Sequence, residues 1–314
     1  FYYKTFMWPK SFWYKVYEPI IRKAAGFGAA SIKHDKERYE HKYEYCDLLI
    51  AGSGPSGLAS AYAAAQNGAK VILAEDKSRF GGSLLTSEVT IGNQSGQEWA
   101  EKIISELKSM PNVIVKNRSQ VFGYYDHNML VMSERVSDHL PKTDKYIPKQ
   151  RLWYIRAKEV VISSGSIERP LVFGNNDVPG VMLSSAAKEY LKVYGVLVGK
   201  KPIIFTNNDS GYETAIEFKK NGVDPIILDT RKNPKSEIID EAKNLGINIK
   251  NSHVVVAAQG YKKVKSADIA SISEDKKQLG KIESIQCDCI CVSGFWTPTI
   301  HLASQSGNKL KFDD

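Results

Sequence analysis

Alternating blocks of apolar and polar residues predict an α/β protein built from two similar units. The first unit has an apolar run at residues 46–51, a small-residue helix after residue 54 and a second apolar run at 69–74. The second unit repeats this order, with strands at 202–206 and 226–229 around a helix at 210–221. Short continuous apolar runs that alternate with helical segments are typical of buried parallel strands.

Between the two units the periodicity changes. A helix is expected over residues 97–110, because Trp99, Ile103, Ile104 and Leu107 share one face. Short alternating runs at 112–116, 120–125, 128–133 and 151–156 then predict a β-meander.

The turn after the first strand carries the motif Gly52-Ser-Gly54-Pro-Ser-Gly57. Gly52 permits a tight turn, Gly54 permits close approach of a pyrophosphate, and Gly57 permits close packing of the helix on the strand. The second strand ends at Glu75 and Asp76, where a carboxylate accepts hydrogen bonds from ribose hydroxyls and disfavours a 2′-phosphate. The motif therefore predicts a dinucleotide site for NAD or FAD rather than NADP.

The corresponding turn of the second unit is Thr206-Asn-Asn-Asp-Ser210-Gly211, which lacks the first two glycines. Asp209 would place a negative charge where a pyrophosphate would lie. Asp209 or Ser210 is expected to cap the following helix instead. We expect a structural Rossmann-like unit here, with a nucleotide site as the less favoured alternative.

Two further segments resemble the flavoprotein superfamily that has two dinucleotide-binding domains. Phe80-Gly-Gly-Ser83 resembles its Gly-Gly segment, which flanks the pyrophosphate. Val160-Val-Ile-Ser-Ser-Gly165, followed by Arg169-Pro170, resembles its second motif. The resemblance implies two Rossmann-like three-layer lobes of the glutathione-reductase type with a β-meander.

We predict three parts in the chain. Residues 1–43 form an aromatic and basic N-terminal arm, residues 44–180 and 281–314 form the dinucleotide-binding domain, and residues 181–280 form an inserted second Rossmann-like domain.

Composition and charge draw attention to the arm. The chain has 314 residues, 42% of them hydrophobic, which excludes a disordered or collagen-like protein. Its formal net charge is +8, and residues 1–46 carry nine Lys and Arg against five Asp and Glu. Nine aromatic residues lie in the first 17 positions: Phe1, Tyr2, Tyr3, Phe6, Trp8, Phe12, Trp13, Tyr14 and Tyr17. Such a segment is expected to pack on a partner subunit or on the chain's own core, with nucleic-acid stacking the least favoured alternative.

The cysteines indicate a structural role. Cys287, Cys289 and Cys291 alternate, which predicts one face of a strand with Asp288 and Ile290 on the other face. Neither these residues nor Cys46 have metal-ligand or CxxC spacing, so no metal site and no dithiol chemistry is expected, and the location is predicted to be cytoplasmic.

No stretch approaches the roughly 18 apolar residues of a membrane span. No triad or paired-carboxylate pattern emerges, so no catalytic residue is assigned.

Longer strings resemble the α subunit of heterotetrameric sarcosine oxidase across essentially the whole chain. They are Phe1-Tyr-Tyr-Lys-Thr-Phe-Met-Trp-Pro9, Tyr17-Glu-Pro-Ile-Ile-Arg22, Val121-Phe-Gly-Tyr-Tyr-Asp126, Thr206-Asn-Asn-Asp-Ser210 and Gly294-Phe-Trp-Thr-Pro298. The resemblance implies a subunit of an enzyme that demethylates sarcosine oxidatively, passes electrons through FAD and covalent FMN to oxygen, and transfers a methylene group to tetrahydrofolate. It implies NAD in this chain, FMN at the interface with the β subunit, and FAD and the sarcosine-type amine in the β subunit. The γ and δ subunits are further partners, whereas no nucleic acid and no membrane is expected.

The resemblance also implies the site. By motif position, NAD contacts fall on Gly52, Gly54, Ser56, Gly57, Glu75, Asp76, Lys77, Ser83 and Val121. The small-residue motifs add Pro55, Gly82, Ser164, Gly165 and Gly294 to the expected cofactor-binding set. Phe295 departs from the family pattern, which usually has a second glycine before Trp296. The family chain is also much longer, and its C-terminal tetrahydrofolate-binding domain has no counterpart here.

Two alternatives remain open. One is an FAD-dependent NADH oxidoreductase or a component of a dye-linked amino-acid (proline) dehydrogenase, which requires an intact second glycine motif. The other is a structural subunit whose dinucleotide is architectural.

Overall fold

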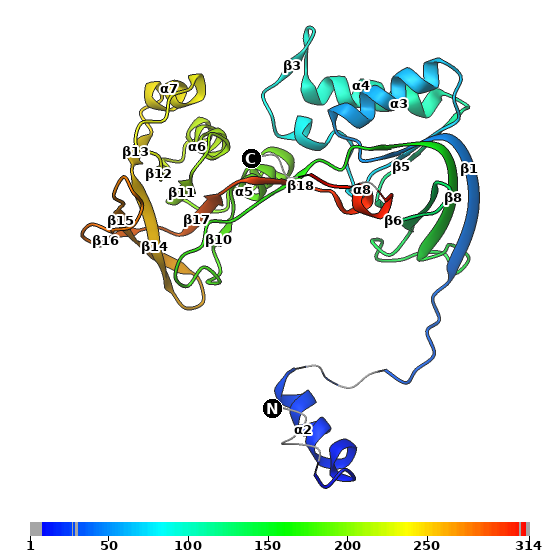
Figure 1. The fold of residues 1–314 in the computed structure, drawn as a ribbon, viewed down its shortest axis with the longest axis horizontal. Coiled ribbons are helices and arrows are strands. Elements are labelled where there is room, and N and C mark those ends of the chain that lie inside the picture. Colours follow the sequence, from blue (N-terminus) through cyan, green and yellow to red (C-terminus); the bar gives the residue numbers. More distant parts are fainter. Residues whose placement is uncertain (1–7, 27, 29–30, 308, 312–314) are drawn as a thin grey trace.

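A computed structural model describes residues 8–26, 28, 31–307 and 309–311 of the chain. Two α/β lobes lie side by side and are joined by a pair of short antiparallel strands, β9 (Ser166–Glu168) and β18 (Trp296–Pro298) (Figure 1). The predicted α/β class with two Rossmann-like three-layer lobes of the glutathione-reductase type is confirmed.

The first lobe is built on a six-stranded sheet with the order β5-β2-β1-β8-β7-β6. Its strands are β1 (Tyr39–Ala51), β2 (Val71–Ala74), β5 (Val113–Lys116), β6 (Ser119–Tyr125), β7 (Met129–Arg135) and β8 (Gln150–Ile162). Its helices are α3 (Pro55–Gln66), the 3₁₀ helix η2 (Gly82–Leu85), α4 (Gly96–Ser109) and α8 (His301–Gln305), and the hairpin β3 (Thr90–Ile91) and β4 (Gln94–Ser95) precedes α4.

Helices α3 and α4 cover one face of this sheet, as Figure 1 shows. Their apolar stripes pack Leu58 and Leu107 against strand residues such as Ile50 and Leu73, all of which are buried. The opposite face packs Leu49 and Ile72 against meander residues that include Trp153 and Met132. Helix α4 begins with a capping box in which Ser95 and Glu98 exchange side-chain and backbone hydrogen bonds.

The run at 112–116 was expected in the meander, and that part of the prediction is wrong. Strand β5 pairs in parallel with β2, whereas only β6, β7 and β8 form antiparallel pairs. In so short a segment the hydrophobic pattern does not distinguish the two neighbours, and the pairing depends on contacts distant in sequence.

The second lobe has a parallel sheet with the order β10-β17-β11-β12-β13. These strands are β10 (Val181–Leu183), β11 (Pro202–Thr206), β12 (Ile226–Asp229), β13 (Asn248–Asn251) and β17 (Cys289–Ser293). The helices are α5 (Ser184–Tyr194), α6 (Ser210–Lys220) and α7 (Glu237–Asn244). A three-stranded antiparallel sheet contains β14 (His253–Gly260), β15 (Val264–Ser271) and β16 (Glu283–Gln286).

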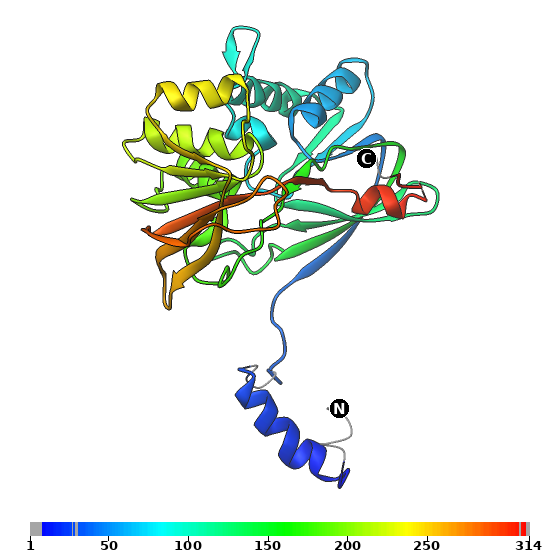
Figure 2. The same cartoon turned by 60° about the vertical axis from the view of Figure 1, so that its left-hand side comes forward.

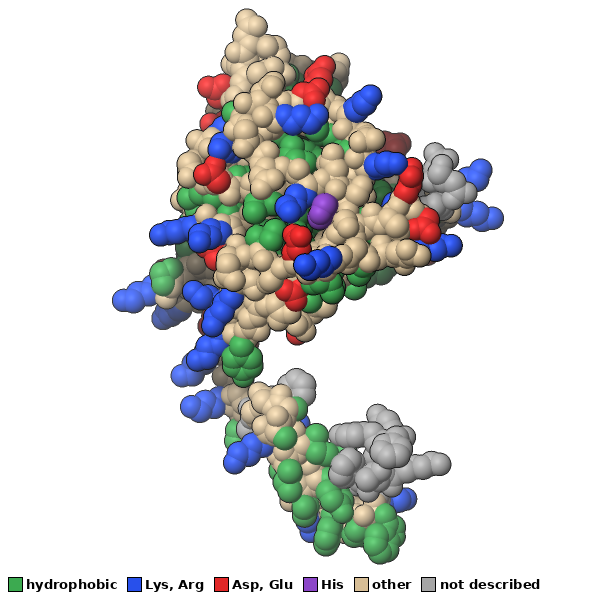
Figure 3. All heavy atoms as spheres, turned by 90° about the vertical axis from the view of Figure 1, so that its left-hand side faces the viewer, with side chains coloured by type: hydrophobic (Ala, Val, Ile, Leu, Met, Phe, Trp, Pro, Cys, Tyr) green, Lys and Arg blue, Asp and Glu red, His purple; other side chains and the backbone are tan. Residues whose placement is uncertain are grey.

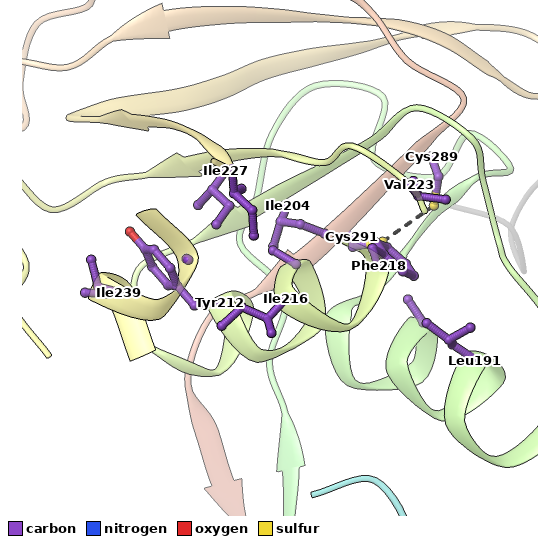
Figure 4. Close-up of a cluster of buried hydrophobic side chains, with 14 residues drawn as sticks. Leu191, Ile204, Tyr212, Ile216, Phe218, Val223, Ile227, Ile239, Cys289 and Cys291 are labelled. Carbon is purple, nitrogen blue, oxygen red and sulfur yellow. Dashed lines mark hydrogen bonds between the residues drawn. The ribbon is translucent and has the colours of Figure 1, made fainter. Parts of the chain in front are cut away.

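The parallel sheet of the second lobe is the middle of three layers. One face packs on the three helices, with Ile204, Tyr212, Phe218 and Ile227 at the centre of the cluster (Figure 4). The other face packs on the antiparallel sheet through residues such as Phe205.

The return of the chain to the first lobe was expected at residue 281, and the strand pairing contradicts that boundary. Strand β16 pairs with β15, and β17 lies between β10 and β11 in the second sheet. The second lobe therefore extends to Ser293. The chain returns to the first lobe through β18.

The cysteine pattern is confirmed only for two residues. Cys289 and Cys291 face the helices, with their sulfur atoms 3.6 Å apart, and Ile290 faces the other way. Cys287 lies on the same side as Ile290, against the prediction. The carboxylate of Asp288 accepts hydrogen bonds from the backbone N–H groups of Lys200 and Lys201, so β17 begins only after this residue.

The N-terminal arm stands apart from both lobes (Figures 1 and 2). It contains the π-helix η1 (Trp13–Tyr17) and helix α2 (Glu18–Ala24), neither of which has a buried residue. Trp8 and Tyr14 are each 81% exposed, and Figure 3 shows the hydrophobic side chains gathered on the arm. Packing on the chain's own core is therefore wrong for the arm from Trp8 onward. Phe1, Tyr2, Tyr3 and Phe6 lie outside the described residues, and the arm ends earlier than residue 43, because β1 begins at Tyr39.

Within the described ranges, no helix is long and apolar enough to cross a membrane. In that part of the chain, no group of three or more His, Cys, Asp or Glu residues is arranged to bind a metal.

Candidate dinucleotide site

The glycine turn connects the end of β1 to the start of α3. Gly52 has a φ of +105°, and a Cβ at this position would lie 2.3 Å from the carbonyl oxygen of Ser163. A Cβ on Gly57 would lie 2.0 Å from the carbonyl oxygen of Gly52. The close approach of α3 to β1 and β8 therefore requires glycine at both positions.

Gly54 has the opposite environment. It is the N-cap of α3, no side chain caps that helix, and no heavy atom lies within 4 Å of the position that its Cβ would occupy. Pro55 and Ser56 follow it on the exposed first turn. An open helix N-terminus without a side chain at its entrance fits the pyrophosphate of a dinucleotide, because its free N–H groups and its dipole favour an anion.

The Gly-Gly segment lies directly against this turn. A Cβ on Gly82 would lie 2.8 Å from Cα of Gly54, and the N–H of Gly81 donates to the carbonyl oxygen of Ser53 over 3.1 Å. Ser83 is exposed beside it. The structure thus brings both glycine segments together, and the absence of a side chain on Gly82 permits this close contact.

Glu75 directly follows β2 and holds the glycine turn through hydrogen bonds. Its Oε2 accepts from the N–H of Ser53 at 2.9 Å and from the Ser53 hydroxyl at 2.5 Å, while its Oε1 accepts from the N–H of Lys77 at 2.9 Å. The side chain is 6% exposed. Burial, followed by a hydrogen bond with Asp76, raises the pKa of Glu75 above its ordinary value. Sequence reasoning missed Ser53, although it is the small polar residue between the first two glycines.

The neighbouring residues place several charges at the same end of β2. Asp76 is exposed, and its carbonyl oxygen accepts from Nη2 of Arg135 at 2.9 Å. The Nζ of Lys77 reaches Glu189 of helix α5, so the second lobe contacts this segment. Arg135 was also missed, because only the folded meander brings the end of β7 to the end of β2.

The remaining expected residues make contacts outside the glycine turn itself. Val121 is half-buried in β6 and packs against the meander core. The Ser164 hydroxyl donates to the carbonyl oxygen of Thr299, and the N–H of Thr299 donates to Gly165, so both residues hold the chain that follows β18. Gly294 lies at the end of β17, and its close contacts are with Arg169 and Asn208 rather than with the glycine turn.

The corresponding turn of the second lobe is filled by its own side chains. Nη1 of Arg231 donates to Asp209 at 2.8 Å, and Nη2 donates at 2.8 Å to Asp229, which is fully buried. Asp229 also accepts from the hydroxyl of Tyr212, and burial together with this bond raises the pKa of that phenol. Asp209 occupies the N-cap position of α6 as expected, but its side chain makes no capping hydrogen bond, and the Oδ1 of Asn208 accepts from the N–H of Ser210.

Comparisons with known proteins agree with these two lobes. The family model described as pyridine nucleotide-disulphide oxidoreductase matches residues 46–313. The sarcosine oxidase subunit alpha of Rhizobium meliloti (strain 1021) is 42% identical over 98% of this chain, and that of Corynebacterium sp. (strain P-1) is 33% identical over 92%. This chain spans 30% of the length of each relative.

Among solved structures, the thioredoxin reductase of T. acidophilum has a TM-score of 0.65 at 18% identity, and the match covers 85% of this chain and 82% of that one. This likeness shows the fold. The family model covers both lobes, and each of these two sarcosine oxidase subunits matches more than nine tenths of the chain. The chain therefore belongs to the pyridine nucleotide-disulphide oxidoreductase family and is a homologue of the sarcosine oxidase α subunit, with a dinucleotide-binding Rossmann fold.

Proposed function

We propose that this chain is the NAD-binding part of the α subunit of a heteromeric sarcosine oxidase, an enzyme that demethylates sarcosine oxidatively to glycine. The similarity to two sarcosine oxidase α subunits supports the assignment to this enzyme. The observation that carries the binding function is the contrast between the two turns: the first is open above Gly54, and the second is filled by Asp209 and Arg231.

The open turn accommodates one dinucleotide. The N-terminal turn of α3, from Pro55 to Gly57, together with Gly52, Gly54, Gly82 and Ser83, would hold the pyrophosphate. Glu75, Asp76, Lys77 and Val121 would hold the adenosine, and the carboxylates favour NAD over NADP. Ser164, Gly165 and Gly294 are proposed for the other end of the cofactor. A pyridine nucleotide supplies hydride chemistry when bound, and the residues of this chain bind and orient it.

The filled turn argues against the alternative of an FAD-dependent NADH oxidoreductase. Such an enzyme needs a second nucleotide site, and here Asp209 would repel a pyrophosphate at the same position. The ion pairs of Arg231 with Asp209 and Asp229 leave that site without free cationic charge. An architectural NAD without a redox step remains compatible with the proposed site.

The remaining cofactors and partners belong to the proposed assembly. FMN would lie at the interface with the β subunit, and FAD and the sarcosine-type amine in the β subunit. The γ and δ subunits complete the assembly, and tetrahydrofolate would bind a further domain. The linker between the lobes, formed by residues 166–168 and 295–298, exposes apolar residues that support contact with other subunits. Ile167, Phe295 and Trp296 are 56%, 65% and 44% exposed. Four free cysteines favour the reducing cytoplasm.

The test is purification of the native complex that contains this chain, followed by measurement of oxygen consumption with sarcosine, dimethylglycine and L-proline. We expect three further subunits to copurify and sarcosine to be the best substrate. Purification of the chain alone with NADH-dependent reductase activity would contradict the proposal and favour the oxidoreductase alternative.

A further inference from the structure

We propose that Glu189, on helix α5 of the second lobe, is a specificity-determining residue for the dinucleotide site of the first lobe. It neutralises Lys77 and thereby withholds that charge from the 2′-phosphate of NADP. The inference rests on the proposed NAD site and adds to it a residue from the other lobe.

The geometry of Lys77 supports this role. Its Nζ lies 3.0 Å and 2.9 Å from the two carboxylate oxygens of Glu189. Its backbone is anchored at the site, because its N–H donates to Glu75 and its carbonyl oxygen accepts from the N–H of Arg118. A change at Glu189 therefore redirects the Lys77 side chain without displacing the backbone at the end of β2.

The charges near the ribose position show why Lys77 matters. Glu75 and Asp76 disfavour a 2′-phosphate, whereas Lys77, Arg118 and Arg135 are the basic residues grouped around the same strand end. A basic side chain at this place is what accommodates NADP in Rossmann domains. The carboxylate of Glu189 neutralises the ammonium group of Lys77, which lies two residues after Glu75, the proposed ribose contact.

Other contacts fix the position of α5 independently of Glu189. Lys192 of α5 forms ion pairs with Glu88, which follows η2, and with Glu217 of α6. Tyr194, the last residue of α5, lies under the guanidinium of Arg79, whose carbon is 6.0 Å from the ring centre. Loss of the Glu189 charge is therefore expected to free Lys77 while the lobes keep their arrangement.

The direction of the effect depends on two interactions of Lys77, its ion pair with Glu189 and its proposed contact with a 2′-phosphate. The Lys77 and Glu189 side chains are 55% and 32% exposed, so their mutual attraction is weak. A charge-assisted hydrogen bond to a phosphate is stronger than an average exposed ion pair. A freed Lys77 should therefore favour a nucleotide that carries the additional phosphate.

The experiment measures dissociation constants of NAD and NADP by calorimetry on the full chain stripped of nucleotide. We expect Glu189→Gln to tighten NADP binding about fivefold, the scale of one partly exposed ionic contact, and to change NAD binding less than about twofold. The double variant Lys77→Met/Glu189→Gln should lose the gain. Lys192→Met, which removes the neighbouring ion pairs of the same helix, is the matched control and should show no gain.

An unchanged ratio of NADP to NAD affinity in Glu189→Gln would overturn the inference, as would a gain that persists in the double variant. A gain of equal size in Lys192→Met would also overturn it, because that result would assign the effect to a shift between the lobes. A wild-type chain that binds NADP and NAD equally well at the outset would overturn the inference alone. A wild-type chain that binds neither nucleotide would overturn the proposed NAD site itself.

Discussion

Gly54 and Gly57 belong to the same turn but are required for different physical reasons. Gly57 allows α3 to pack on β1, since any side chain there meets the backbone of Gly52. Gly54 faces open space, so a side chain there would meet no protein atom, and we propose that its absence serves the dinucleotide. The two positions can therefore be separated experimentally.

We expect Gly54→Ala to leave the free energy of unfolding within about 0.5 kcal/mol of wild type, because the methyl group meets no protein atom. The same methyl group blocks the approach of a pyrophosphate, so NAD affinity should fall at least about tenfold. Gly57→Ala is the matched variant and should lose about 1–3 kcal/mol of stability through overpacking. Urea denaturation and calorimetric titration measure both quantities, and full NAD affinity in Gly54→Ala would contradict the assigned site.

The carboxyl of Glu75 combines a structural role with the proposed ribose contact. Because burial raises its pKa in the folded chain, ionised Glu75 lowers stability at pH values above that raised pKa, and protonation relieves the cost. Protonation thus favours folding, whereas ribose recognition favours the ionised carboxylate, because only the ionised form is purely a hydrogen-bond acceptor.

NAD affinity should therefore weaken as the pH falls from 7 towards 5. The loss should begin at a higher pH than for an ordinary glutamate, whose pKa is about 4.3. Titration of NAD binding across this range measures the effect, and Glu75→Gln should bind more weakly at pH 7 and show a flatter profile. A wild-type affinity that does not change with pH would show that Glu75 does not contact the ribose.

At the scale of elements, the turn between β11 and α6 keeps the Rossmann order of strand, turn and helix, but side-chain interactions hold this turn together. Arg231 bridges the half-exposed Asp209 and the buried Asp229, and Asn208 connects the turn to the backbone of β17 through Ser293. A phosphate at the start of α6 would therefore have to displace the side chain of Asn208, which already accepts from the N–H of Ser210.

This arrangement predicts unequal effects of two substitutions. Arg231→Met should lower the free energy of unfolding by about 3–5 kcal/mol, because it leaves Asp229 buried without its cation. Asp209→Asn removes only a half-exposed partner and should cost less than about 1 kcal/mol. Chemical denaturation of both variants tests the difference, and equal losses would show that the buried pair is not the important one.

The sequence predicted those elements whose signals are local. Strands β11 and β12 have the predicted bounds, and the glycine turn precedes α3 as expected. It did not predict the position of β5 or the insertion of β17 between β10 and β11, because those pairings join segments distant in sequence. For the same reason, Glu75 could be selected from its spacing, whereas Ser163, Arg135 and Glu189 become neighbours of the site only in the folded chain.

At the scale of the whole molecule, two of the described regions that expose apolar side chains bear on the proposed assembly. One is the arm with Trp8, Tyr14 and Ile20, and the other is the linker between the lobes with Phe295 and Trp296. Both regions agree with a chain that spans 30% of the length of its multi-subunit relatives. Residues 31–38, which lie outside regular secondary structure, lie between the arm and strand β1 of the first lobe (Figure 2).

Limited trypsin digestion tests the independence of the arm. In the isolated chain, Lys33, Lys36 and Arg38 are exposed and lie outside regular structure, so cleavage should occur there first and leave the two lobes intact. In the assembled complex the same bonds should be protected. An arm that resists cleavage in the isolated chain would show that it packs on this chain after all.

The central claim is that one open turn, in the first lobe, binds one NAD. The most direct measurement is the identity and amount of dinucleotide released on denaturation of the purified full chain, determined by chromatography and mass spectrometry. We predict one NAD per chain and no FAD. Release of FAD without NAD, or of two dinucleotides per chain, would contradict the account.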